Sequence, residues 1–125
     1  RACALAKARG AKKAIKLAVS VPAHCELMQP AAAGLETRLA EVEFGAPGVR
    51  VIHNFDVESH ADGAAIRAAL VAQMCRPVRW VETIERFARE GITHIAECGP
   101  GKVLAALNKR IDKNLETVGL GDPAG

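Results

Sequence analysis

Residues 20–30, SVPAHCELMQP, decide how the rest of the chain is organised around them. Here His24 directly follows a short apolar segment and directly precedes a long amphipathic one. Pro22 fixes its own φ and has no N–H to donate, so a strand cannot simply continue through it. Val21, the residue before that proline, is pushed toward extended geometry. The pattern predicts that His24 lies in a loop between a strand end and a helix. In open α/β sheets, binding and catalytic residues lie in such loops.

Outward from this stretch, the chain alternates between strand and helix patterns. On the amino-terminal side we expect a helix over 2–9 that stops at Gly10 and a strand over 14–19. On the other side, apolar residues recur every three or four positions over 27–42, which predicts a helix there. A short strand over 49–52 and a polar loop over 54–63 follow, and Asp62 is a good N-cap for the next helix.

The last part of the chain continues the alternation. Pro77 breaks the helix that Asp62 opens, and a further helix is expected from about 79 to 90. A strand over 93–96, a Gly-Pro-Gly turn, a helix and a strand over 115–120 complete the pattern. Strands that alternate with helices predict an α/β fold with a mostly parallel sheet. Three or four short strands are too few to cover four helices with apolar faces, so we expect part of a larger domain.

The composition excludes some classes of function. A chain of 125 residues, half of them apolar, has room for one core, and aromatic residues make up only 3%, which argues against stacking on single-stranded nucleic acid. The net charge of +3 is unevenly spread, because the part before Glu26 carries basic residues and no acidic one. These residues are Arg1, Lys7, Arg9, Lys12, Lys13 and Lys16. They form either a solvated face or a surface that steers an acidic partner toward the protein.

No apolar run approaches 18 residues and no secretory signal is visible, so we expect neither a membrane span nor export. The chain starts with Arg1 rather than Met, which indicates a processed chain or a fragment. The four cysteines form no CxxC pair and the four histidines no HxxxH pair. We therefore expect no metal site and a reduced, cytoplasmic chain.

Two motifs bear on catalysis. Gly99-Pro100-Gly101-Lys102 follows a predicted strand and opens a helix, which suits either a phosphate cradle or, as we favour, a plain tight turn. A GxSxG nucleophile elbow is absent from these residues, and neither Ser20 nor Ser59 stands in a glycine-flanked turn. The chain thus has a candidate base, His24, without a candidate nucleophile. Gln73 falls on or beside a buried helix face and needs a hydrogen-bond partner there.

The stretch from Ser20 to Ala31 closely resembles the catalytic-histidine segment of the malonyl-CoA:acyl-carrier-protein transacylases. Three further blocks resemble the same family in the same order. They are Phe44–Pro47 with Val51–Val57, the helix and Pro-Val-Arg-Trp junction of Leu70–Trp80, and the turn of Glu97–Leu104. The resemblance covers essentially the whole chain.

The resemblance implies roles for five residues. His24 would be the general base, and the main chain of Gln73 would take the third position of a catalytic triad. Asn54, Gly99 and Gly101, with His53 nearby, would line or brace the substrate cleft. Basic side chains would meet an acidic carrier protein or the phosphates of coenzyme A; these are Lys12, Lys13, Lys16, Arg76, Arg79 and Lys102.

The resemblance also implies an architecture. Residues 1–19 would end a ferredoxin-like small subdomain, and residues 20–125 would form the C-terminal part of a large α/β-hydrolase-like subdomain. The family's serine and its substrate-binding arginine match no position here. Without that arginine, the sequence does not show which acyl group is preferred. The implied activity is malonyl transfer from coenzyme A, a substrate rather than a cofactor, to acyl carrier protein. The alternative is a non-catalytic module that only docks a carrier protein.

Overall fold

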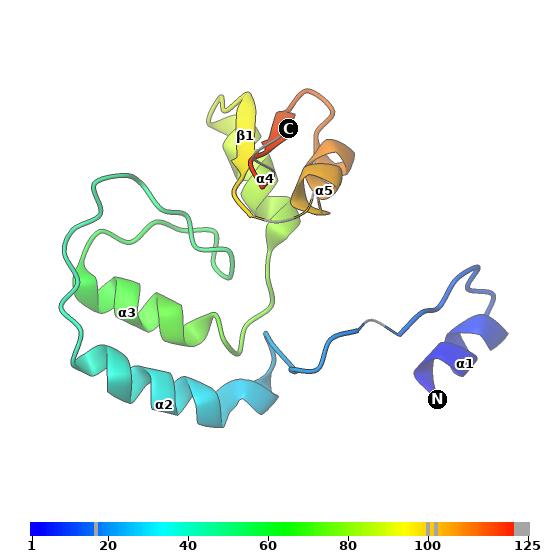
Figure 1. Ribbon diagram of the computed structural model, residues 1–125, viewed down its shortest axis with the longest axis horizontal. Helices are drawn as coiled ribbons and strands as arrows, with labels where there is room; N and C mark the ends of the chain where they lie inside the picture. Colours follow the sequence, from blue (N-terminus) through cyan, green and yellow to red (C-terminus); the bar gives the residue numbers. More distant parts are fainter. Residues whose placement is uncertain (17, 100, 102, 122–125) are drawn as a thin grey trace.

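The computed structural model describes residues 1–16, 18–99, 101 and 103–121. Figure 1 shows the elements in chain order. They are α1 (Ala2–Ala8), the 3-10 helix η1 (Glu26–Met28), α2 (Gln29–Ala40), α3 (Gly63–Ala72), α4 (Trp80–Arg89), β1 (His94–Glu97), α5 (Val103–Ile111) and β2 (Glu116–Gly119).

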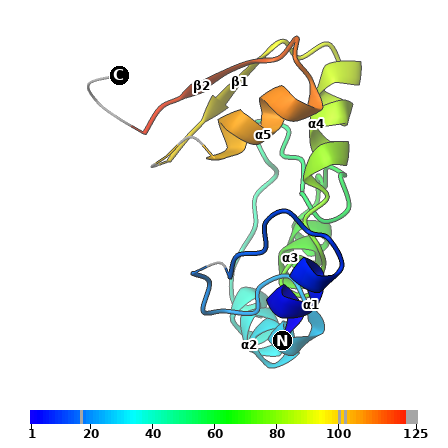
Figure 2. The ribbon, with the colours of Figure 1, turned by 90° about the vertical axis from the view of Figure 1, so that its right-hand side faces the viewer.

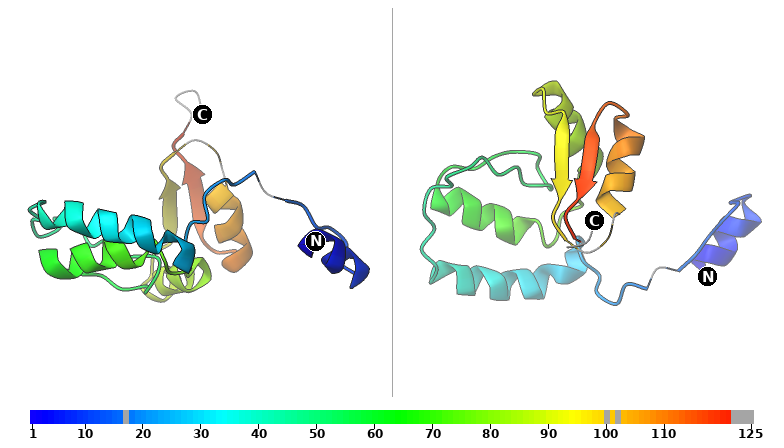
Figure 3. Two further views of the ribbon diagram at one scale, coloured as in Figure 1. Left: turned by 90° about the horizontal axis from the view of Figure 1, so that it is seen from below. Right: turned by 45° about the horizontal axis from the view of Figure 1, so that its top comes forward.

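The elements pack in two groups. α2 lies against α3 in one group, while α4, α5 and the two strands form the other. Figure 2 shows the helical pair at one end of the molecule and the strands with α4 and α5 at the other. Both views of Figure 3 show α1 standing apart at the end of an extended segment. Residues 41–62 join α2 to α3, and residues 73–79 join α3 to α4 and so connect the two groups.

β1 and β2 pair in parallel, with His94 opposite Glu116 and Glu97 opposite Gly119. Two parallel strands need a crossover, and α5 supplies it by packing against β2. Along both strands exposed and half-buried residues alternate, as they do when one face of a sheet is covered. The predicted α/β class with a parallel sheet is confirmed.

The core of the second group lies between α4 and α5. Ile84 is completely buried and Asn108 is 1% exposed. Trp80 closes this core, because its indole Nε1–H donates to Oδ1 of Asn108 over 2.9 Å. In the first group the buried side chains are Ala32 on α2 and Ile66 and Ala69 on α3.

The predictions of strands over 14–19 and 49–52 are wrong. The described residues of both ranges are assigned to no strand, and Leu17 lies outside the described residues. A strand is held by hydrogen bonds to a neighbouring strand. The segment between α1 and η1 instead runs alone (Figure 1), with Ile15 63% and Val19 67% exposed. His24 therefore follows an extended segment rather than a strand.

The predicted helix ends are largely confirmed. Asp62 caps α3 by accepting a hydrogen bond from the Ala65 N–H over 2.8 Å. Gly10 and Gly91 follow the ends of α1 and α4 with φ of 89° and 80°, which glycine adopts without strain. α3 ends at Ala72, five residues before Pro77. Within the described part of the chain, no helix is long and apolar enough to cross a bilayer.

Candidate functional site: a histidine at the end of α3

His24 is held by two consecutive main-chain carbonyl groups. Its N–H donates to the oxygen of Met74 over 3.0 Å. Its ring Nδ1 lies 2.9 Å from the oxygen of Gln73. Both the backbone and the ring are therefore fixed by the segment that directly follows α3.

The end of α3 explains why these carbonyls are available. The last carbonyl groups of a helix lack partners within the helix. Gln73 is the C-cap of α3, and Met74 follows it in the same tight turn, with its N–H bonded to the oxygen of Val71. The exposed loop around His24 therefore bonds to groups that would otherwise need water.

The backbone of His24 is strained in a way that fits a functional position. Its φ is 63°, in the left-handed region, which for a residue other than glycine costs about 1 kcal/mol. The bonds to Gln73 and Met74 hold this conformation. The Cys25 thiol also donates to the oxygen of Pro22 over 3.2 Å and tightens the same turn.

The bond to Gln73 determines which ring nitrogen carries the proton. A carbonyl oxygen only accepts hydrogen bonds, so Nδ1 of His24 must be the donor. In the neutral ring, Nε2 is then left without a proton and available to take one. Such an imidazole is equipped to act as a general base.

Sequence reasoning placed Gln73 near a buried face and gave its amide side chain a need for a partner. The structure shows Gln73 half-buried, and the atom that bonds His24 is its main-chain oxygen. The geometry that the family resemblance implied for this pair is therefore present. A catalytic role for either residue remains a prediction.

Asn54 and His53 belong to a loop that is fastened to α4. The Asn54 oxygen accepts a hydrogen bond from the Arg79 N–H over 2.7 Å, and the Arg79 side chain donates to the oxygen of Asp56 over 3.1 Å. Oδ1 of Asn54 is buried without a hydrogen-bond partner among the described residues. These contacts show how Asn54 is positioned, while its role toward a substrate remains a prediction.

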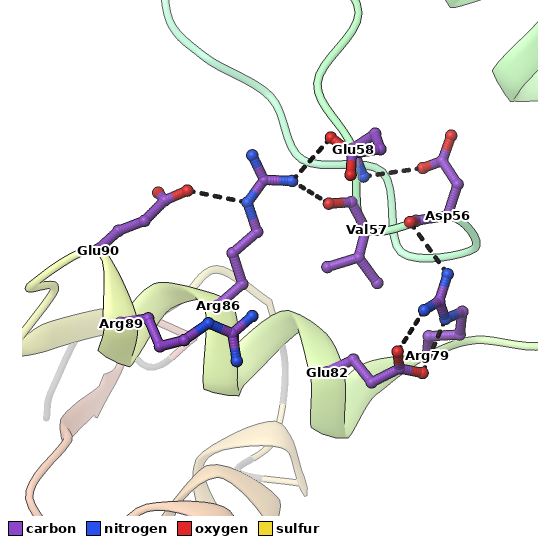
Figure 4. A pocket seen from close by; sticks show the side chains of 8 residues that line it. All are labelled: Asp56, Val57, Glu58, Arg79, Glu82, Arg86, Arg89 and Glu90. Atoms are coloured by element: carbon purple, nitrogen blue, oxygen red, sulfur yellow. Dashed lines mark hydrogen bonds and ion pairs between the residues drawn. The ribbon is translucent and has the colours of Figure 1, made fainter.

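A polar pocket of about 400 Å³ lies where this loop meets α4 (Figure 4). Arg79, at the N-cap of α4, and Arg86, within it, reach to the loop. Arg79 also pairs with Glu82 of α4, and Arg86 pairs with Glu90 at the C-cap. These guanidinium groups are already bonded to carboxylates and carbonyls. Their role in this pocket is therefore to hold the loop against α4, and they are not free to bind a ligand. His24 is not among the residues that line it.

The beginning of α5 offers little room for a phosphate cradle. The carboxylate of Glu97 accepts hydrogen bonds from the N–H groups of Leu104 and Ala105 over 3.1 and 2.9 Å. It therefore occupies the helix end that a phosphate would need. Gly101 has a φ of 104°, which favours glycine, whereas Pro100 and Lys102 lie outside the described residues. Gly99 lines a pocket with Trp80 and Asn108, and roles for Gly99 and Gly101 in substrate binding remain predictions.

The basic residues proposed to meet a partner are accessible where they are described. Lys12, Lys13 and Lys16 are exposed in the segment after α1, and Arg76 and Arg79 are exposed between α3 and α4. Arg79 is not free for a partner, because it is bonded to Glu82 and the loop. In the described part of the chain, no three His, Cys, Asp or Glu side chains gather as a metal site would require.

Two structural roles escaped the sequence analysis. Met74 supports His24 through a main-chain oxygen, and no residue type marks such a position. Arg79, which was expected to meet a partner, and Arg86 instead donate hydrogen bonds to the loop after Asn54. The only sequence feature that links these roles is that Arg79 lies close along the chain to Gln73 and Met74.

Comparisons with known proteins show what the whole chain is similar to. No family model matches the chain. A malonyl CoA-acyl carrier protein transacylase of Salmonella typhimurium is 51% identical over 124 residues, which are 99% of this chain and 40% of that protein. The crystal structure of a malonyl-CoA:acyl carrier protein transacylase from Xanthomonas oryzae matches with a TM-score of 0.92 and 50% identity, over 98% of this chain and 39% of that one.

A third match is the structure of a type II PKS acyl-carrier protein in complex with its malonyl-transacylase. It has a TM-score of 0.91 and 47% identity, and it covers 98% of this chain and 40% of that one. The fold is therefore the α/β fold of the acyltransferases, and the chain matches a part of it. Within that class, the chain is similar over nearly its whole length to the malonyl CoA-acyl carrier protein transacylases, at 48–51% identity. It spans about 40% of the length of the curated relatives it matches.

Proposed function

We propose that this chain supplies the general base of an enzyme that transfers a malonyl group from coenzyme A to the phosphopantetheine thiol of acyl carrier protein, in fatty acid biosynthesis. The observation that carries the proposal is the 2.9 Å contact between Nδ1 of His24 and the oxygen of Gln73. That contact leaves Nε2 to accept a proton. The roughly 50% identity to malonyl transacylases supports the choice of substrates.

In this mechanism the nucleophile is a serine of the family's GxSxG motif, which lies outside these 125 residues. Nε2 of His24 takes the serine proton as the hydroxyl attacks the thioester carbonyl. The resulting imidazolium then protonates the departing coenzyme A thiolate. Covalent catalysis through an acyl-serine divides the transfer into two steps and predicts ping-pong kinetics.

The second half-reaction uses the same ring. Nε2 of His24 deprotonates the carrier protein's thiol, which attacks the acyl-serine, and the proton returns to the serine oxygen. The oxygen of Gln73 holds the ring in one tautomer in both steps and adds no charge of its own. The reaction needs no cofactor, and coenzyme A enters only as the substrate thioester.

The partners and the location belong to the same proposal. An acidic carrier protein would meet the basic segment before Glu26, and one similar transacylase has been solved with its acyl-carrier protein. The rest of the enzyme would cover faces that are exposed here. Four cysteines without disulfides fit the reducing cytoplasm.

One alternative has its own support. The GxSxG motif is absent and six basic residues precede the first acidic one, which also suits a module that docks a carrier protein without catalysis. The two functions differ in what the chain does when it is joined to an upstream segment that carries the serine.

The test compares the 125-residue chain with a polypeptide that joins it to such a segment. We expect the joined protein to load malonyl groups onto carrier protein with ping-pong kinetics, and the chain alone to be inactive. If the joined protein folds and binds carrier protein but forms no acyl-enzyme, the docking function replaces the catalytic one. Enzyme-like transfer by the chain alone would contradict the placement of the nucleophile outside it.

A further inference from the structure

Two histidines and one aspartate form a compact cluster on the loop after residue 52. The rings of His53 and His60 lie with their centroids 5.1 Å apart. His53 is only 8% exposed. Nε2 of His60 lies 2.8 Å from Oδ2 of Asp56. The cluster therefore contains two imidazoles and a single carboxylate.

Both oxygens of that carboxylate are already engaged. Oδ2 of Asp56 bonds His60, while Oδ1 accepts the N–H of Glu58 over 3.0 Å. A proton on His53 would therefore create a buried charge beside His60, and the neighbouring carboxylate already accepts hydrogen bonds from two other groups. Burial and the neighbouring His60 lower the pKa of His53, and Asp56 offsets this only in part.

The same loop is held in a strained conformation. Val57 has a φ of 64°, an unfavourable value for a β-branched residue, and it is 7% exposed. Its N–H donates to the oxygen of His53 over 2.9 Å, and the His53 N–H donates to the oxygen of Glu58 over 2.8 Å. Arg86 of α4 bonds the Val57 oxygen, as Figure 4 shows. Opening the loop would release the strain at Val57.

We propose that His53 is a proton-operated lock: the neutral ring keeps residues 53–58 fastened to α4, and its protonation releases them. The two histidines differ in their partners, since the His60 ring lies 2.8 Å from the Asp56 carboxylate, whereas among the described residues the His53 ring has no hydrogen bond to a carboxylate. The charged and titratable side chains around the lock come from its own segment, from the preceding one and from α4. They are Asp56, Glu58, His60, Arg50, Arg79, Glu82, Arg86, Arg89 and Glu90.

The lock is connected to the candidate base. The Asn54 oxygen of this loop accepts a hydrogen bond from the Arg79 N–H, and only four residues separate Arg79 from Met74, whose oxygen holds His24. Release of the loop would loosen this connection and the support of His24. This last step rests on the proposed function, whereas the lock itself does not.

The experiment follows amide hydrogen exchange in the full 125-residue chain between pH 8 and pH 5, corrected for the intrinsic exchange rate. Exchange protection of the Val57 amide, which is bonded to the His53 oxygen, shows whether the loop is closed. We expect its protection to fall by about tenfold per pH unit below about pH 6.5, because one proton is coupled to opening. The Thr83 amide of α4, bonded to the oxygen of Arg79, should stay protected over the same range.

His53→Gln should keep the Val57 amide protected down to pH 5. His94→Gln is the matched control, since His94 is an exposed histidine that pairs with Glu116 on the sheet. It should behave like the parent. If His53→Gln does not fold at pH 8, His53→Leu takes its place and should show the same flat profile.

Two results would overturn the proposal. One is loss of Val57 protection at the same pH in the parent and in the His53 variant. The other is a His53 ring that titrates in NMR spectra as an ordinary imidazole while the Val57 amide stays protected. Neither measurement depends on transferase activity, so failure of the lock is distinguishable from failure of the proposed function.

Discussion

Nδ1 of His24 lies 2.9 Å from the main-chain oxygen of Gln73, a residue 49 positions further along the chain. In many catalytic triads a carboxylate holds the histidine in this way. Here a neutral carbonyl at the end of α3 fixes the same tautomer. The geometry therefore depends on how α3 ends and not on the chemistry of any side chain at position 73.

The first prediction concerns His24 itself, in a polypeptide that joins this chain to the serine-bearing segment. His24→Ala should leave the fold intact, because the side chain is exposed and contributes little to the core. Loss of a general acid–base group typically lowers the rate by about 10²–10⁴. Rapid-quench measurements should show this loss both in formation of the acyl-enzyme and in its discharge to carrier protein.

The other three histidines are the controls for this experiment. His53→Ala, His60→Ala and His94→Ala should stay within a few-fold of the parent at pH 8. If one of them falls as far as His24→Ala, or if His24→Ala keeps both rates, the base has been assigned to the wrong residue.

The second prediction separates the main chain of Gln73 from its side chain. Gln73→Ala keeps the carbonyl group that His24 bonds, so the rate should change by no more than a few-fold. The ring should keep its proton on Nδ1, which ¹⁵N NMR of the imidazole reports directly. A shift of the proton to Nε2 in Gln73→Ala would show that the amide side chain, rather than the carbonyl, sets the tautomer.

Much of this site could be predicted from the sequence, because the signals are local. Asp62 followed by an apolar helical pattern predicted where α3 begins, and Pro22 predicted the loop that carries His24. The pairing of His24 with Gln73 came from the family resemblance. Spacing alone cannot bring two residues 49 positions apart into contact.

The failures have one physical cause. The patterns over 14–19 and 49–52 are those of strands, but a strand exists only beside another strand. The part of the chain that the structure describes offers these two segments no partner. The lock at His53 was missed for a different reason: the loop is held by Arg79 and Arg86, and no sequence pattern shows which loop an arginine bonds.

The third prediction tests the cap that positions α3. Asp62→Ala removes the acceptor for the Ala65 N–H and should lower the free energy of unfolding by about 1 kcal/mol. Asp62→Ser keeps a capping oxygen and should lie within a few tenths of the parent. Urea denaturation of the three proteins measures the difference. Equal losses in both variants would mean that the carboxylate's charge, and not the cap, stabilises the helix.

The fourth prediction concerns the exposed apolar side chains. Leu27 is 74%, Val49 75% and Val103 70% exposed, and contiguous apolar surface tends to be covered in folded proteins. The chain alone should therefore self-associate, with a sedimentation coefficient that rises with concentration. Joining it to the serine-bearing segment should abolish this behaviour. A monomeric chain with sharp cooperative melting would contradict the prediction.

The last prediction concerns Asp56 and acid. Burial alone would raise the pKa of Asp56, but hydrogen bonds from the Glu58 N–H and from His60 outweigh it, so the pKa lies below its ordinary value of 3.8. A carboxylate whose pKa is lowered by folding binds protons less well in the folded state. Its contribution to stability is therefore fully present above the unfolded-state value and is lost as pH falls through the folded-state value.

Asp56→Asn removes that contribution and should cost about 1 kcal/mol at pH 7, since a charge-assisted hydrogen bond is lost at a partly exposed site. The difference from the parent should shrink as pH falls below about 3.8. Both proteins should carry His53→Gln in this comparison, so that the lock does not contribute. Urea titrations at a series of pH values from 7 to 3 measure the gap. A gap that stays constant over that range would show that Asp56 stabilises the loop by packing and not as a carboxylate.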